Sequence, residues 1–203
     1  MDKPLTTEEK IIQSAVEIFS QKGYSGTTTK EIAQNAGIAE GTIFRYFPKK
    51  KDLLHKILYK VIETVAPNII GSGLDEIFRD HNGKSDRETI VAFIENRLNL
   101  IEKNWPLIKV VMTEAQYHQD IQQLFFKKIV PPIKQMVDRF FEEGIKQGRF
   151  KNYNSGVITI MLMGALGSNL LAIKTGVMDE KIMSRREVIE QIADILLTGI
   201  CKA

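Results

Sequence analysis

Apolar residues recur every three or four positions along nearly the whole chain, which is the spacing of amphipathic α-helices. No stretch alternates apolar and polar residues in the manner of a strand rich in β-branched side chains. The pattern therefore predicts an all-α protein with about nine helices. It is clear in the first helix, whose apolar positions are Ile11, Ile12, Ala15, Val16 and Phe19.

Start and stop signals divide this pattern into elements. A Ser or Thr followed three residues later by Glu predicts a helix start, and glycine or proline beyond the last apolar position predicts an end. These signals place the N-terminal helices at 7–22, 28–36, 39–47 and from 50 to a bend or end at Pro67. Later helices are expected at 85–103, from 105, at 120–148 with a kink at Pro131 and Pro132, at 155–174 and at 184–200, after a loose connection at 71–86 that contains a short helix at 74–78.

The second and third helices have the lengths and spacing of a helix-turn-helix, which places its second helix in the major groove of DNA. Gly37 and Ile38 form the turn, and Ala33 is small enough for the two helices to approach closely. Gly41 lowers the helix propensity by about 1 kcal/mol. Close approach of the backbone to DNA would explain why glycine is present at this position.

Polar and basic residues surround this segment where DNA phosphates would lie. Thr27, Thr28 and Thr29 offer hydroxyls and backbone N–H groups at a helix N-terminus, which is a natural anion site. A lysine run alone is more often solvated surface, but here it coincides with the helix-turn-helix spacing. The positive charges of this cluster are Arg45, Lys49, Lys50 and Lys51, and Tyr46 adds a hydroxyl.

The overall charge is too small to indicate nucleic-acid binding by itself. The 203 residues carry a net charge of +3, and residues 1–65 contain ten Lys and Arg against eight Asp and Glu, a balance of +2. The prediction therefore depends on the local cluster. Cys201 is the only cysteine, and the N-terminus is too polar for a signal peptide, so we expect a cytoplasmic protein without intramolecular disulfides.

The sequence indicates neither an enzyme nor a membrane protein. It has three histidines, no phosphate-binding glycine loop and no metal-ligand spacing, so we expect no catalytic residues, cofactor or metal. The apolar run at 156–173 is borderline for spanning a bilayer, at about 18 residues. A helix that is buried or lies at a subunit interface is the favoured interpretation.

Residues 8–60 resemble the DNA-binding domain of the tetracycline-repressor (TetR/AcrR) family of bacterial transcriptional regulators. The resemblance is carried by AVEIFSQKGYSGTTTKEIAQNAGI and continues through AEGTIFRYFPKKKDLL. It implies a DNA-binding domain at 1–50, with the helix-turn-helix at 28–47 and a linking helix at about 50–66, and an effector-binding and dimerisation domain at 51–203. Spacing and resemblance together indicate these DNA-binding residues: Thr27, Thr28, Thr29, Lys30, Ala39, Glu40, Gly41, Thr42, Arg45, Tyr46, Lys49, Lys50 and Lys51.

The expected recognition helix departs from the family pattern at three positions. Its N-cap is Ala39 where the family usually has Ser or Thr, which weakens the helix start by about 1 kcal/mol. Glu40 stands where a basic residue is frequent. It either accepts a hydrogen bond from cytosine N4 or caps its own helix, and the second role is slightly favoured. Phe44 replaces a common Tyr and is expected in the core.

The resemblance also implies a homodimer that pairs through its last two helices and binds a near-palindromic operator in double-stranded DNA. A strip of small residues flanked by apolar ones supports close helix approach in the penultimate helix. A monomeric core is the alternative for the same residues. The expected interface consists of Val157, Met161, Gly164, Gly167, Ser168, Leu171, Val188, Ile192, Ile195 and Leu196.

The middle helices are expected to enclose a mostly apolar pocket for a small effector, whose binding moves the fourth helix and weakens DNA binding. Core packing predicts the same residue types and is the safer interpretation for any single one. Glu114 and Asp138 lie in apolar helical segments, where exposure or an internal salt bridge is favoured over binding a cationic ligand. The pocket candidates are Phe93, Leu100, Trp105, Met112, Tyr117, Phe125, Met136, Phe140 and Met163.

These features predict a ligand-responsive transcriptional regulator, most simply a repressor. The alternative is a helical interaction adaptor that keeps the fold without binding DNA, and Glu40 is the feature that favours it.

Overall fold

The computed structural model describes residues 4–65, 77–78, 84–177 and 184–201. Every regular element among these residues is a helix, so the all-α prediction is confirmed. The chain forms two compact units. The first unit contains 1–67 and 103–130, and the second contains 68–102 and 131–203. The first unit therefore extends beyond the expected DNA-binding domain at 1–50.

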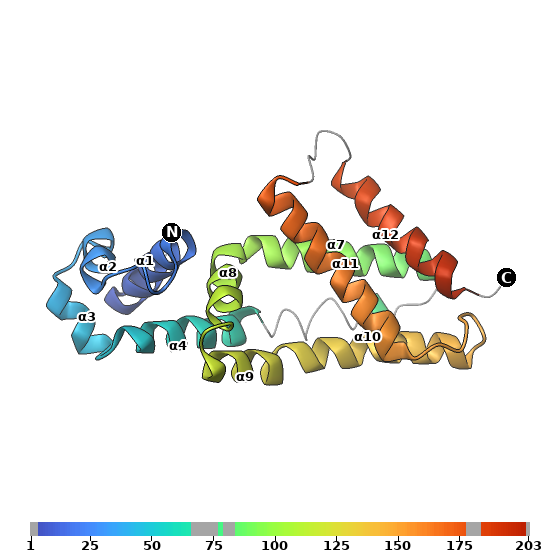
Figure 1. Ribbon diagram of the computed structural model, residues 1–203, viewed down its shortest axis with the longest axis horizontal. Helices are drawn as coiled ribbons and strands as arrows, with labels where there is room; N and C mark the ends of the chain where they lie inside the picture. The colour runs from blue at the N-terminus through green and yellow to red at the C-terminus, as the bar shows by residue number, and fades with distance from the viewer. Residues whose placement is uncertain (1–3, 66–76, 79–83, 178–183, 202–203) are drawn as a thin grey trace. The chain divides into compact units, whose positions relative to one another are not determined.

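Figure 1 shows the helices along the chain. In the first unit they are α1 (Thr7–Lys22), α2 (Thr29–Ala36), α3 (Glu40–Tyr46), α4 (Lys50–Lys60), which continues as the π-helical turn η1 (Val61–Val65), α8 (Trp105–Glu114) and α9 (Gln119–Lys128). The other helices are α7 (Asp86–Lys103), α10 (Val130–Lys146), α11 (Ser155–Thr175) and α12 (Arg185–Ile200).

The predicted helix starts agree closely with the structure. Thr6, Thr28 and Ser184 are N-caps, and each forms a reciprocal capping box with the Glu three residues later. Ser85 and Glu88 exchange the same pair of bonds at the start of α7. Gly37 ends α2 in the left-handed conformation with φ 67°.

The predicted single helix at 120–148 is wrong. The structure has two helices, α9 and α10, that are separated at Ile129. Pro131 and Pro132 lie in the first turn of α10, where a missing backbone N–H removes no intrahelical bond. The predicted end of the fourth helix at Pro67 and most of the loose connection at 71–86 lie outside the described residues.

The first unit is built around α4. Its residues Leu53, Leu54, Ile57 and Leu58 are fully buried, and α4 packs against α1, α8 and α9. Helix α1 also contacts α2 and α8, and α2 contacts α3. The helix-turn-helix is thus attached to α8 through both α1 and α4.

A cluster of polar contacts fixes the connection between α1 and α2, and we call it the Tyr24 cluster (Tyr24, Thr27, Lys50, Glu114 and His118). Glu114 of α8 is only 5% exposed, and its Oε1 accepts a hydrogen bond of 3.1 Å from the backbone N–H of Tyr24. The ammonium of Lys50 donates to the carbonyl oxygens of Tyr24 and Thr27, at 2.7 Å each. The connection is therefore held from α8 and from α4 at once.

Aromatic contacts complete the Tyr24 cluster. The ammonium of Lys50 lies 4.3 Å from the centroid of the Tyr24 ring, and the His118 ring meets the same ring edge-on at 5.4 Å. Burial lowers the pKa of Lys50, and the nearby charge of Glu114 opposes this shift. Burial also raises the pKa of Tyr24. Both shifts show that this connection is partly withdrawn from water.

A second contact joins α9 to α4. The Asp120 carboxylate lies 2.8 Å from Lys51 Nζ and 2.9 Å from His55 Nε2. The hydrogen bond from Lys51 holds the pKa of Asp120 well below its usual range, and His55 acts in the same direction. Lys51 thus has a carboxylate partner at the start of α4.

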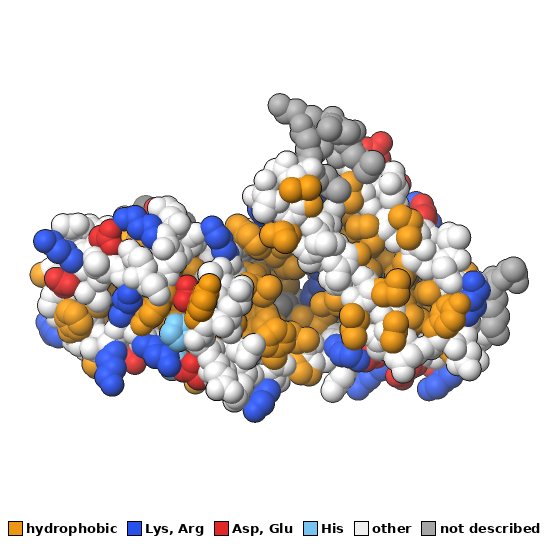
Figure 2. Space-filling model, viewed as in Figure 1, with side chains coloured by type: hydrophobic (Ala, Val, Ile, Leu, Met, Phe, Trp, Pro, Cys, Tyr) orange, Lys and Arg blue, Asp and Glu red, His pale blue; other side chains and the backbone are white. Residues whose placement is uncertain are grey.

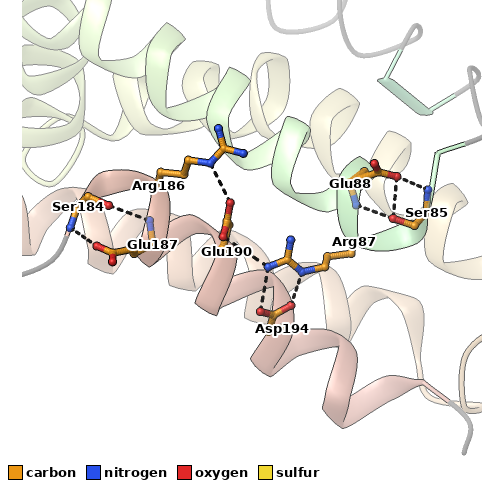
Figure 3. A network of polar contacts seen from close by, with 8 residues as sticks. All are labelled: Ser85, Arg87, Glu88, Ser184, Arg186, Glu187, Glu190 and Asp194. Atoms are coloured by element: carbon orange, nitrogen blue, oxygen red, sulfur yellow. Dashed lines mark hydrogen bonds and ion pairs between the residues drawn. The ribbon is translucent and has the colours of Figure 1, made fainter.

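In the second unit, α12 is fixed to α7 along its polar side (Figure 3). The Arg87 guanidinium donates to both carboxylate oxygens of Asp194, at 2.6 and 3.0 Å, and lies 3.7 Å from Glu190. Arg185 of α12 pairs with Glu102 of α7. These contacts set the rotation of α12 about its axis, and hence which apolar side chains it exposes.

Replacing Lys50 with Ala removes two charge-assisted hydrogen bonds and the contact with the Tyr24 ring. We expect the free energy of unfolding to fall by about 1–2 kcal/mol. The measurement is urea denaturation at a fixed protein concentration, followed by circular dichroism. Lys49→Ala is the matched control, because Lys49 is exposed and its substitution should leave stability unchanged. Equal stability of the two variants would contradict the structural role given to Lys50.

Candidate nucleic-acid interface

The helix-turn-helix is assembled as the spacing predicted. After the left-handed Gly37, the N–H of Ile38 donates to the carbonyl oxygen of Ala33 and closes the end of α2. Ala33 and Ile43 are buried on neighbouring helices, so small and branched side chains fill the space between α2 and α3. Ala39 is the N-cap of α3 and makes no side-chain cap, as the sequence indicated.

One face of α3 is buried and the opposite face is open. Ile43 and Phe47, four residues apart, anchor the helix to the unit. Gly41 and Arg45 are exposed on the other side. A Cβ added at Gly41 would meet nothing within 4 Å, so no protein neighbour requires glycine there. The packing of the first unit therefore gives no reason for glycine at this position.

Glu40 has a partner that the sequence did not indicate. Its Oε1 accepts a hydrogen bond of 2.6 Å from the hydroxyl of Thr29. This bond joins the first turn of α3 to the first turn of α2. The bond is neither the contact with cytosine nor a cap of α3, but the carboxylate lies in the first turn of its helix, where it agrees with the helix-dipole role that was also favoured.

Two of the expected phosphate contacts are corrected by the geometry. Thr27 is 2% exposed, and its hydroxyl donates to the carbonyl oxygen of Gly23 at 2.8 Å, so it faces the protein. Lys50 directs its ammonium into the Tyr24 cluster. Both were assigned to DNA from the local sequence, whereas their partners come from neighbouring parts of the fold.

The remaining predicted contacts lie at the surface. Lys30, Arg45, Tyr46 and Lys49 are exposed, and Thr28 is an exposed N-cap. Thr29, Thr42 and Lys51 are half-buried, and Lys51 is paired with Asp120. The exposed cations thus flank the open face of α3.

The prediction that Phe44 belongs to the core is wrong. Its side chain is 46% exposed, and it follows the buried Ile43 directly. Successive residues on an α-helix point about 100° apart, so neighbours in sequence can lie on different faces. The prediction relied on the apolar side chain of Phe44 and did not take account of its direction on the helix.

Some of the residues expected at a dimer interface form an apolar surface of the second unit, whereas Val188 and Leu196 are buried within that unit and belong to its core. Val157, Met161, Leu171 and Ile195 are exposed, and Ile195 is 74% exposed. Figure 2 shows hydrophobic side chains gathered over α11 and α12. A groove of about 530 Å³ between these helices is also lined by Tyr153 and Gly199, which the sequence did not indicate, together with Val157, Met161, Ile192, Ile195 and Leu196.

The residues expected to line an effector pocket are distributed over both units. In the second unit, Phe93 and Phe140 are buried in the core, and the ring of Phe78 lies 5.5 and 5.1 Å from their ring centroids. In the first unit, Met112 and Tyr117 are exposed. Core packing therefore accounts for Phe93 and Phe140, and Met112 and Tyr117 are surface residues. The half-buried candidates are Leu100, Trp105, Phe125, Met136 and Met163.

Asp138 forms the internal salt bridge that was favoured for it, whereas Glu114 is buried and accepts a hydrogen bond from a backbone N–H. Asp138 pairs with Lys134 one turn earlier on α10. Glu114 is part of the Tyr24 cluster, where it accepts a hydrogen bond from the backbone N–H of Tyr24. The sequence drew attention to Glu114 as an acid in an apolar segment, but it could not show that the partner is a backbone N–H 90 residues away.

Comparison with known proteins agrees with this geometry. Residues 11–57 match the family model described as bacterial regulatory proteins, tetR family. The chain is 24% identical over 195 residues to the fatty acid metabolism regulator protein of Bacillus subtilis, covering 94% of each chain. It is 43% identical over 160 residues to the HTH-type transcriptional regulator YuxN of the same organism, covering 69% of this chain and 52% of that one.

The fold is also shared with solved structures. The fatty acid degradation regulator FadR from Bacillus halodurans superposes with a TM-score of 0.68 at 21% identity, covering 98% of both chains. At this identity the likeness shows the fold alone. The family match lies on the helix-turn-helix and on the helices that support it. The chain belongs to the tetR family of bacterial regulatory proteins, and it is a DNA-binding transcriptional regulator and not an enzyme.

Proposed function

We propose that the chain binds a near-palindromic operator as a homodimer, with α3 in the major groove, and that a small apolar effector releases it. The observation that carries this proposal is the open face of α3. Gly41 leaves room for close approach, and Arg45 and Tyr46 project from the same exposed helix. Lys49 follows directly, so its charge can meet the adjacent phosphates.

The apolar surface of α11 and α12 supports the dimer. Monomeric soluble proteins rarely leave large contiguous apolar surfaces in water. Helix α11 is apolar and long enough to cross a membrane by length and composition, with a mean hydropathy of 1.9, yet only 33% of that stretch is buried in one protomer. A second copy would cover the exposed side and fill the groove. Two copies related by a two-fold axis then present two α3 helices to a symmetric operator.

Effector control has a physical route through the first unit. Helices α7 and α10 lie mainly in the second unit. In the chain, α7 leads directly into α8 of the first unit, and α9 of the first unit leads directly into α10. Helix α8 carries Glu114, and α9 carries Asp120. We therefore extend the expected movement of α4 to include the Tyr24 cluster, which holds the helix-turn-helix from α8.

DNA binding is tested on an operator selected from random duplex DNA. We expect Arg45→Ala to abolish the preference for that operator, because Arg45 faces outward from α3. Lys49→Ala should weaken binding to all sequences and reduce the slope of log K against log salt by about 2, because each dimer carries two copies. Mobility-shift titrations at several salt concentrations measure both effects.

Lys146→Ala is the matched control for these variants, because Lys146 is exposed in the last turn of α10. It should leave affinity and salt slope unchanged. Unchanged operator binding in both Arg45→Ala and Lys49→Ala would refute the assignment of this face to DNA.

Dimerisation is tested by placing a charge on the apolar surface. Ile195→Asp should convert the dimer to a monomer, because the carboxylate would have to be buried without a partner. Sedimentation equilibrium measures the mass. Leu5→Asp is the control, since Leu5 is exposed in the first unit. A wild-type protein that is monomeric at micromolar concentration would exclude the proposed interface.

The effector is tested with acyl compounds first, because two relatives are named for fatty acid metabolism and fatty acid degradation. A compound that raises the melting temperature of the protein should lower operator affinity by about 5- to 150-fold, the range of ordinary allosteric coupling. The Glu114→Leu variant should still bind the compound, but the bound compound should lower operator affinity less than it does in the wild-type protein. The proposed control fails if no bound compound changes operator affinity.

A further inference from the structure

The exposed aromatic ring of Phe44 is not explained by folding. Helix α3 is held by Ile43 and Phe47, which are both buried. Phe44 points about 100° away from Ile43 and is 46% exposed, and the next residue, Arg45, is exposed as well. Leaving a phenyl ring partly in water gains little for the free protein.

The position of Phe44 on α3 places it at the edge of the open face. Gly41 precedes it by three residues and Glu40 by four, so all three lie on the same side of the helix. The Glu40 carboxylate is held by the Thr29 hydroxyl at 2.6 Å. Gly41 has no side chain and no neighbour within 4 Å of its Cβ position. The ring therefore stands beside open space through which the helix can approach a surface closely.

The chemistry of the major groove restricts what such a ring can recognise. Base edges present hydrogen-bond donors and acceptors there, and the single apolar group is the C5 methyl of thymine. A phenyl ring can neither donate a hydrogen bond nor neutralise a phosphate. A tyrosine at this position would have a hydroxyl for that purpose, but this chain has phenylalanine.

We propose that Phe44 determines operator specificity by packing its ring against the C5 methyl of one thymine in each half-site. This inference rests on the proposed binding of α3 in the major groove. It adds a base preference that the family assignment does not contain. The guanidinium of Arg45, the next residue, can donate hydrogen bonds to a neighbouring base pair. The two side chains would thus recognise adjacent base pairs, one by apolar contact and the other by hydrogen bonding.

The test removes the methyl group from the DNA. Each thymine of the selected operator is replaced by uracil in both half-sites, which keeps base pairing and deletes only the methyl. At one position we expect the affinity to fall about 4-fold per half-site, or about 15-fold for the dimer, which corresponds to one buried methyl in each. With Phe44→Ala the protein should bind the thymine operator more weakly and show no further loss with uracil.

Matched variants make this assignment specific. Phe126 is 52% exposed on α9, so Phe126→Ala removes a similar ring and should keep the full difference between thymine and uracil. Phe44→Leu should retain part of it, because leucine is also apolar. Circular dichroism of each variant confirms that the helices are intact.

Two outcomes would overturn the inference while leaving DNA binding in place. In one, no thymine replacement changes affinity by more than 2-fold. In the other, the uracil effect persists in Phe44→Ala, which would assign the methyl contact to another side chain such as that of Ala39 or Thr42. If no operator can be selected at all, the proposed function itself fails, and the reading of thymine fails with it.

Discussion

The buried carboxylate of Glu114 is the constraint on which the first unit depends. A charge that is 5% exposed is stable only if it is hydrogen-bonded, and its bond to the Tyr24 N–H meets that requirement. The Lys50 ammonium donates a hydrogen bond to the carbonyl oxygen of the same residue, Tyr24, and also lies against the face of its ring. Moving α8 away would leave a buried acid without this partner, so α8 and the helix-turn-helix must move together or exchange partners. Control of the proposed kind would require this contact to have a second arrangement.

The Tyr24 cluster and the Asp120 contact also determine which cations of the lysine run have protein partners. In the lysine run, the half-buried Lys50 bonds to the carbonyl oxygens of Tyr24 and Thr27, and Lys51 pairs with Asp120. Lys49 and Arg45 remain exposed. Fewer cations near α3 are therefore free of protein partners than the sequence indicates, so in the proposed complex affinity would depend more on the fit of α3 in the groove. This agrees with a net charge of only +3 for the chain.

The sequence predicted what local chemistry controls. The capping boxes at Thr6, Thr28 and Ser184 and the left-handed Gly37 are short-range interactions, so their residues identify them. Thr27, Lys50 and Phe44 were misassigned because burial at these positions is decided by packing within the assembled unit. A kink at Pro131 and Pro132 was predicted where the structure has a break at Ile129. The sequence does not distinguish a proline in the first turn of a new helix from a proline at a kink.

If α3 is the recognition helix, as proposed, its short length makes DNA binding depend on the apolar surface of the second unit. Helix α3 has seven residues. Ile43 within the helix and Phe47 at its C-cap are buried, so neither side chain can contact DNA. Few side chains are left to read bases, so one copy discriminates weakly. Two copies on a symmetric site double the number of contacts and fix their separation at about 34 Å or a multiple of it. In the proposed dimer, specificity would come from both copies together, so the exposed apolar residues of α11 and α12 would be as necessary to it as Arg45 on α3.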